Sequence, residues 1–208
     1  ASVSIMKLDY ELKKYLDIPC RTAGFFVDGP VKYAEISEDN NTEIENKTEI
    51  KDKSNRKICD NQIKTRNIMA MVQKMSECII ENEVNFCKLD SYAGDGDFGM
   101  SVAKGFREVR KNWERLMECT TIGNFLDECS LIIMEHCGGA SGPIWGYAFR
   151  SAGHFVGDAV SINLKTFAEM MEASVKGIQK IGEQSFGRGA KVGDKTLVDA
   201  LVPCTDSL

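Results

Sequence analysis

A chain of 208 residues that is 43% hydrophobic and 27% charged can bury one good core, so one principal domain is expected. Its formal net charge of −5 argues against nucleic acid or an anionic membrane as a partner, because both call for a basic face, and no apolar run reaches the roughly 18 residues that cross a bilayer. The eight cysteines show no Cys-x-x-Cys pair and follow no recognisable signal peptide, which predicts a reduced, cytoplasmic protein with buried thiols.

The first 57 residues predict a short ordered piece followed by a linker. Residues 1–8 alternate enough for a strand, and residues 10–16 can form one or two helical turns before Pro19. A strand at the very start has no partner nearby, so we expect the chain to begin inside a domain whose larger part is absent. Residues 27–57 are polar and charged and predict a flexible linker. The expected division is therefore 1–26, 27–57 and 58–208.

From about residue 60 the hydrophobic period becomes helical, so residues 58–208 are predicted to be all-α. Apolar residues recur at spacings of three and four, and after residue 20 nothing alternates convincingly with period two. A short sixth helix is expected to begin near Asp194. The five longer stripes are Ile63, Ile68, Val72, Met75, Ile79 and Ile80 in one helix that ends before Lys88; Val102, Phe106, Val109, Trp113 and Leu116; Ile122, Phe125, Leu126, Cys129, Ile132 and Ile133; Trp145 and Phe149 in a helix from Pro143 to about Phe155; and Phe167, Met170, Met171, Val175, Ile178 and Ile181.

An acidic loop, Asp-Ser-Tyr-Ala-Gly-Asp-Gly-Asp-Phe-Gly at residues 90–99, separates the first two stripes. Asp90, Asp95 and Asp97 place three carboxylates within eight residues, on a backbone whose glycines can adopt unusual dihedrals. Short carboxylates suit Mg²⁺ or Ca²⁺, and Mg²⁺ usually keeps positions open for water and substrate phosphates. An EF-hand fits poorly, because Met100 stands where that loop requires glycine. A solvated acidic turn is the alternative.

Two further glycine-rich loops precede predicted helices. Residues 138–143, Gly-Gly-Ala-Ser-Gly-Pro, offer closely spaced amides at a helix N-terminus, where the helix dipole favours an anion. Residues 187–196 do not match the Walker pattern, and Asp194 or Thr196 could instead cap the last helix. An ordinary glycine turn is the alternative for each loop. Together the three loops predict a Mg-nucleotide site for phosphoryl transfer, with positioning as the main source of catalysis and no catalytic side chain assigned.

These loops resemble the nucleotide-binding L domain of the dihydroxyacetone kinase family. The matching segments, Leu89–Gly99, Gly138–Pro143 and Gly193–Leu201, occur in the family's order and spacing, and the resemblance covers roughly residues 60–208. Residues 1–20 resemble the last strand and tail of the substrate-binding K domain of the same enzymes. Both pieces on one chain point to the single-chain, ATP-dependent form, which in animals includes triokinase with FMN cyclase activity.

The resemblance implies an antiparallel eight-helix barrel, two Mg²⁺ ions on the three loop aspartates, and ATP or ADP beside them. The triose acceptor, dihydroxyacetone or glyceraldehyde, would be held by the absent K domain, and the full-length enzyme could form a homodimer. Alternatives are splitting of FAD at the same site and a silent, ADP-bound interaction module. The residues implied are Asp90, Asp95 and Asp97 for metal, and Asp97, Phe98, Gly99, Met100, Gly139, Ala140, Ser141, Gly189, Thr196 and Leu197 for nucleotide.

Three departures from the family pattern affect these expectations. Phe98 stands where bacterial L subunits commonly have histidine, and Gly189 aligns only after a shift of one residue. The chain also stops at Leu208, before the family's later Gly-Arg-Ala and Asp-Pro-Gly segments and its closing helices. We therefore expect an incomplete barrel that exposes apolar stripe residues and is inactive alone.

Overall fold

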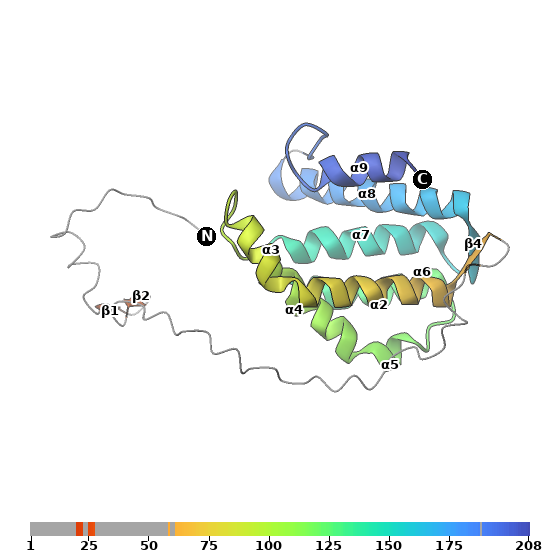
Figure 1. The fold of residues 1–208 in the computed structure, drawn as a ribbon, viewed down its shortest axis with the longest axis horizontal. Coiled ribbons are helices and arrows are strands. Elements are labelled where there is room, and N and C mark those ends of the chain that lie inside the picture. The colour runs from red at the N-terminus through yellow and green to blue at the C-terminus, as the bar shows by residue number, and fades with distance from the viewer. Residues whose placement is uncertain (1–19, 23–24, 28–57, 59–60, 188) are drawn as a thin grey trace. The chain divides into compact units, whose positions relative to one another are not determined.

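The computed structural model describes residues 20–22, 25–27, 58, 61–187 and 189–208 (Figure 1). The strand expected at 1–8, the helical turns expected at 10–16 and nearly all of the expected linker lie outside the described residues. In the first unit of the chain, residues 1–46, β1 (Cys20–Thr22) pairs antiparallel with β2 (Phe25–Val27). Three-residue strands are too short to show a period, so the sequence pattern did not predict this hairpin.

The described part of the second unit, which spans residues 47–208, is a bundle of helices, and this confirms the all-α class. Helix α7 packs along both α6 and α8, and α4 packs on α2, α3 and α6. The long helices lie side by side (Figure 1). The elements are β3 (Gln62–Lys64), α2 (Thr65–Glu81), α3 (Glu83–Asp90), α4 (Phe98–Lys111), α5 (Trp113–Leu116), α6 (Ile122–His136), α7 (Ser141–Val156), β4 (Ser161–Asn163), α8 (Leu164–Phe186) and α9 (Val198–Asp206).

The predicted stripes form the core. All stripe residues of α4, α5 and α6 are buried, and the rings of Trp113 and Phe125 meet edge to face with centroids 6.0 Å apart. Such aromatic pairs contribute beyond the apolar area that they bury. A second, smaller cluster of Ala148, Ile178 and Val198 joins α7, α8 and α9. The helical period therefore identified the buried faces correctly.

The first predicted helix is wrong in three respects. Ile63 belongs to β3, and the helical run is divided at Asn82 into α2 and α3. At this break the side-chain amide of Asn82 donates a hydrogen bond of 2.9 Å to the carbonyl of Cys78, and such local side-chain bonds compete with the helix ladder. Helix α3 then continues to Asp90 instead of ending before Lys88.

A short ribbon closes one end of the bundle. Strands β3 and β4 pair antiparallel, with Ile63 opposite Ile162, and both side chains are buried. The side chain of Asn163 then accepts the N–H of Thr166 at 2.8 Å and so caps α8. The ribbon contradicts the expectation that no alternating segment follows residue 20. It was not predicted because each strand has only three residues, too few to show a period.

Helices α6 and α7 cross closely at this same end. The N–H of Gly123 donates to the carbonyl of Gly157 at 3.1 Å. A Cβ at position 123 would lie 2.3 Å from that carbonyl oxygen and 2.7 Å from the carbonyl oxygen of Gly153. Because both neighbours are backbone atoms, only glycine permits this approach.

The cysteines are only partly as expected. Cys78, Cys87, Cys119, Cys129, Cys137 and Cys204 are free thiols. Cys129 and Cys137 are buried, and burial raises the pKa of the Cys137 thiol to about 11. The expected burial is wrong for Cys78, which lies off the buried stripe of α2, and for Cys204, which is also exposed.

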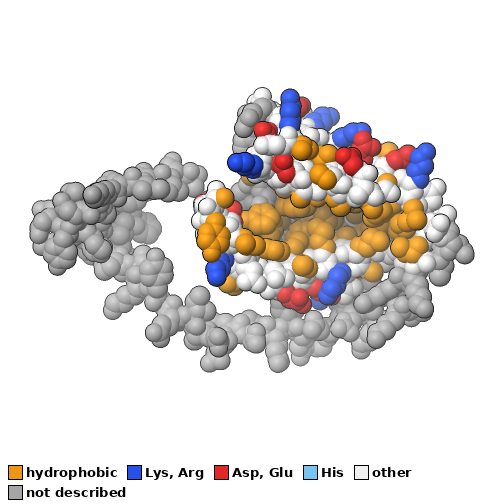
Figure 2. Space-filling view, turned by 45° about the horizontal axis from the view of Figure 1, so that its top comes forward, with side chains coloured by type: hydrophobic (Ala, Val, Ile, Leu, Met, Phe, Trp, Pro, Cys, Tyr) orange, Lys and Arg blue, Asp and Glu red, His pale blue; other side chains and the backbone are white. Residues whose placement is uncertain are grey.

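Apolar surface remains open on the bundle. Figure 2 shows hydrophobic side chains gathered in a long hollow beneath the α8–α9 pair. None of the described helices combines the length and apolarity needed to span a bilayer. Several stripe residues are partly buried against the core instead of exposed: Met75, Ile79, Phe167 and Met171. The incomplete eight-helix barrel stays a prediction.

Candidate functional site

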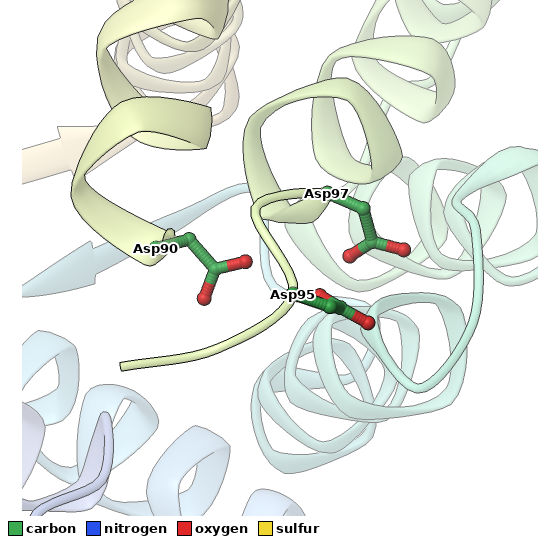
Figure 3. A group of neighbouring side chains, drawn as sticks. All are labelled: Asp90, Asp95 and Asp97. Atoms are coloured by element: carbon green, nitrogen blue, oxygen red, sulfur yellow. The ribbon is translucent and has the colours of Figure 1, made fainter. Parts of the chain in front are cut away.

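The three aspartates of the acidic loop converge where α3 meets α4 (Figure 3). Asp90 ends α3, Asp97 immediately precedes α4, and Asp95 lies between them. One carboxylate oxygen from each residue lies within 4.8 Å of the other two. In the part of the chain that the structure describes, no lysine or arginine forms an ion pair with them. Three carboxylates this close repel one another, so a cation would stabilise the cluster.

Glycines allow the loop to turn tightly beneath Asp90. The N–H of Gly94 donates to the carbonyl of Asp90 at 2.6 Å, and a Cβ on Gly94 would come within 2.4 Å of the Asp90 carboxylate. Gly96 has a φ of +77°, in the left-handed region that favours glycine. The N–H of Phe98 donates to the Asp90 carboxylate at 3.3 Å, which ties the end of α3 to the start of α4.

The electrostatics of the cluster agree with this geometry. Desolvation by surrounding atoms raises the pKa of the Asp97 carboxyl, and the carboxylates of Asp95 and Asp90 raise it further. The nearby Ser101 hydroxyl opposes the shift, and the N–H of Ser101 donates to the carbonyl of Asp97 at 2.9 Å. A donor set made only of carboxylate oxygens fits a hard divalent cation such as Mg²⁺ or Ca²⁺ better than a metal that prefers nitrogen or sulfur.

The second glycine loop lies directly beside the first. The N–H of Gly138 donates to the carbonyl of Ser101 at 3.2 Å, and a Cβ at position 138 would lie 2.8 Å from the Ser101 hydroxyl oxygen. One turn along α4, a Cβ on Gly105 would come within 2.2 Å of the Cys137 sulfur. Ser101 thus contacts both Asp97 and Gly138, and it connects the acidic loop with the loop before α7.

The backbone before α7 is open to a ligand. Gly139 has a φ of +53°, and no atom lies within 4 Å of the position of its missing Cβ. Among the described residues, the N–H groups of Gly139 and Ala140 have no backbone partner, and both residues are exposed. Ser141 begins the helix. Free amides at a helix N-terminus are suited to an anion.

The third loop is organised by Asp199. Its carboxylate accepts the N–H of Gly193 at 2.6 Å and the N–H of Thr196 at 2.8 Å, and these donors hold the pKa of Asp199 below its usual range. The Thr196 hydroxyl accepts the N–H of Val198 at 3.2 Å. Because these bonds fold residues 193–197 into a turn, α9 begins at Val198 and the expected start near Asp194 is wrong.

All three loops lie at one end of the bundle, opposite the β3–β4 ribbon (Figure 1). The third loop is positioned through the smaller core, where Leu197 and Val198 pack with Ile144 and Ala148 from the first half of α7. No hydrogen bond between described residues joins this loop to the aspartates. The structure therefore brings the acidic and Gly138 loops into contact and places the third loop at the same end.

Several residues expected at the nucleotide are engaged within the protein. The Phe98 ring lies 6.2 Å from the Phe86 ring of α3, and Gly99 is buried against the same helix. The N–H of Met100 donates to the sulfur of Cys87 at 3.2 Å, while the Met100 side chain is exposed. These contacts depend on how α3 packs on α4, which the loop sequence alone does not reveal.

Gly189 and Leu197 also face neighbouring elements. A Cβ on Gly189 would lie 2.8 Å from the side chain of Glu183 in α8, and Leu197 is half-buried in the smaller core. Gly193, by contrast, has a φ of +103° and open space at its Cβ position. The exposed part of the third loop is thus centred on Gly193 and Thr196.

Residues 92–208 match the DAK2 domain family. The chain belongs to that family. The segment that matches the family includes Asp95, Asp97 and both later loops, and it begins just after Asp90. The predicted resemblance to the L domain of dihydroxyacetone kinases is confirmed.

Curated relatives of this DAK2 domain carry kinase names. The ADP-binding subunit DhaL of PEP-dependent dihydroxyacetone kinase 2 from Listeria innocua is 33% identical over 132 residues, which cover 62% of this chain and 58% of the relative. L-erythrulose 1-kinase from Mycolicibacterium smegmatis is 30% identical over 148 residues, 69% of this chain and 24% of the relative. Triokinase/FMN cyclase from Mus musculus is 24% identical over 139 residues, 67% of this chain and 23% of the relative. The chain spans less than two thirds of each.

Sequence reasoning overlooked two residues that organise the site of this DAK2 domain. Ser101 lies four residues after Asp97, a spacing that places both on one helix face. Thr196 and Asp199 fit the pattern of a helix capping box, in which a serine or threonine is followed three residues later by an acidic residue. Both patterns are present in the sequence, but each is so short and common that it does not by itself point to a site.

Proposed function

We propose that this DAK2 domain binds Mg-ATP or Mg-ADP at the three-loop end of the bundle. It would serve as the nucleotide part of a kinase that transfers the γ-phosphoryl group of ATP to a hydroxyl of dihydroxyacetone or glyceraldehyde. The observation that carries the proposal is the contact between the acidic cluster and the open amides before α7, made through Ser101. The kinase names of the relatives support it.

We assign one group of loop residues to binding the metal and another to binding the phosphates. Asp90, Asp95 and Asp97 would hold two Mg²⁺ ions, which neutralise phosphate charge. The amides of Gly139 and Ala140 would bind phosphate oxygens, because they lie free at a helix N-terminus. In this arrangement the third loop, with Gly193 and Thr196, would contact the nucleotide on the side away from the aspartates.

The acceptor sugar would come from elsewhere. No side chain in the three loops is an obvious nucleophile or general base, so we expect the domain to position the substrates and to stabilise developing charge. We propose residues 1–26 as part of a substrate-binding domain, 27–57 as a linker and 58–208 as the nucleotide domain. On this view the isolated chain binds nucleotide but does not phosphorylate dihydroxyacetone.

Calorimetric titration tests the proposal. We expect ADP and ATP each to bind the chain at one site in the presence of Mg²⁺, and we expect this binding to be lost when EDTA removes the metal. Nucleotide binding that persists unchanged in EDTA would contradict the role given to the aspartates. No binding in Mg²⁺ would refute the proposed function.

A further inference from the structure

Helix α3 carries one of the three aspartates but packs only weakly against the bundle. None of its eight residues is buried, and Val84 and Leu89 are 78% and 65% exposed. It follows directly after the break at Asn82, and α4 is its main packing partner. The position of Asp90 relative to Asp95 and Asp97 therefore depends on the contact between α3 and α4.

An ion pair fixes the start of α3 to the middle of α4. The guanidinium of Arg107 bonds the carboxylate of Glu83, and both side chains are partly shielded, at 35% and 24% exposure. Glu83 is the first residue of α3. At this place α3 and α4 also approach so closely that Gly99 has no room for a side chain, because a Cβ there would lie 2.0 Å from the Glu83 carbonyl oxygen.

Arg110 provides an internal comparison on the same helix. Its guanidinium pairs with Glu77 at 3.2 Å, and the two side chains are 21% and 29% exposed. Glu77, however, belongs to α2, which has its own buried stripe and does not carry an aspartate of the cluster. The two ion pairs are similar in exposure, although Glu77 also pairs with Lys74, and of the two only the Arg107 pair holds the helix that ends in Asp90.

On the basis of the proposed function, we infer that Arg107 and Glu83 are positioning residues for the metal centre. The pair holds α3 against α4 and so sets the separation of Asp90 from the other two carboxylates. Because partly exposed ion pairs contribute little to global stability, its loss should affect the metal site more than the fold. The pair touches no metal ligand itself, so the effect of its loss on metal affinity is limited by the energy of the pair, which corresponds to about fivefold at most.

The test compares Arg107→Met with Arg110→Met. Mn²⁺ affinity is measured by electron paramagnetic resonance, and Tm is measured in parallel without metal. We expect Arg107→Met to weaken Mn²⁺ binding about fivefold, Arg110→Met to leave it within about twofold, and both to lower Tm by similar small amounts. Arg107→Lys, which keeps the charge, should restore most of the affinity.

The outcomes separate this inference from the proposed function. If the wild-type chain binds Mn²⁺ and Arg107→Met binds it equally well, the positioning role is wrong while the metal site stands. Equal losses of affinity in Arg107→Met and Arg110→Met would also overturn the positioning role. If the wild-type chain does not bind Mn²⁺, both the metal site and the inference fail.

Discussion

Replacing Asp97 with asparagine is expected to weaken the binding of Mg²⁺, and with it of Mg-nucleotide, by about a hundredfold or more. Asparagine keeps the size of the side chain but removes one of three negative ligands. Even substitutions outside the ligand shell commonly cost metal sites about 10- to 100-fold in affinity. Titration calorimetry with Mg²⁺ and ADP measures the change. Asp158→Asn, an exposed aspartate beside β4, is the matched control and should bind as the wild type does.

The same substitution should raise Tm in the absence of metal. The pKa of Asp97 is raised in the folded chain by desolvation and by Asp95 and Asp90, so its ionised form opposes folding at neutral pH. A neutral side chain removes this repulsion. Opposite changes in stability and in affinity would mark a functional cluster. A variant that bound Mg-nucleotide as tightly as the wild type would show that Asp97 is not a ligand.

Gly99→Ala is expected to lower both stability and nucleotide affinity. A Cβ at position 99 would meet the Glu83 carbonyl oxygen at 2.0 Å and the Cys87 amide nitrogen at 2.8 Å. These are backbone atoms, so α3 itself must move, and such overpacking typically costs about 1–3 kcal/mol. Because α3 ends in Asp90, its displacement should also disrupt the metal centre.

Gly123→Ala is the matched control for Gly99→Ala. Its Cβ would also meet a backbone carbonyl oxygen, that of Gly157, at 2.3 Å, but at the opposite end of the bundle. We expect a similar loss of Tm and an unchanged affinity for Mg-ADP when binding is measured well below the transition. Equal losses of affinity in both variants would mean that nucleotide binding merely follows global stability.

The long helices could be predicted from the sequence because each carries an apolar period over many residues. The stripes from Val102 to Leu116 and from Ile122 to Ile133 are buried throughout. Shorter features were not predictable in this way. The strands β3 and β4 offer three residues each, and the break at Asn82 lies where a side chain bonds locally to Cys78 and Asn85, which no periodicity reports.

The site was predictable to the extent that its chemistry is local. Asp90, Asp95 and Asp97 lie within eight residues, so their convergence follows from a glycine-rich turn. The partners of the Phe98 and Met100 amides were not predictable, because they depend on α3 folding back against α4. In this structure that packing gives both amides a partner within the protein.

The central claim is that three separate loops surround one metal-bound phosphate group. The most direct test is nuclear magnetic resonance of the chain with ADP and substoichiometric Mn²⁺, whose unpaired electrons broaden nearby amide signals. The account predicts that the signals of Gly96, Gly139 and Gly193 broaden together, while those of Ile63 and Ile162 in the distant ribbon stay sharp. Broadening at Gly96 alone, with Gly139 and Gly193 unaffected, would contradict it.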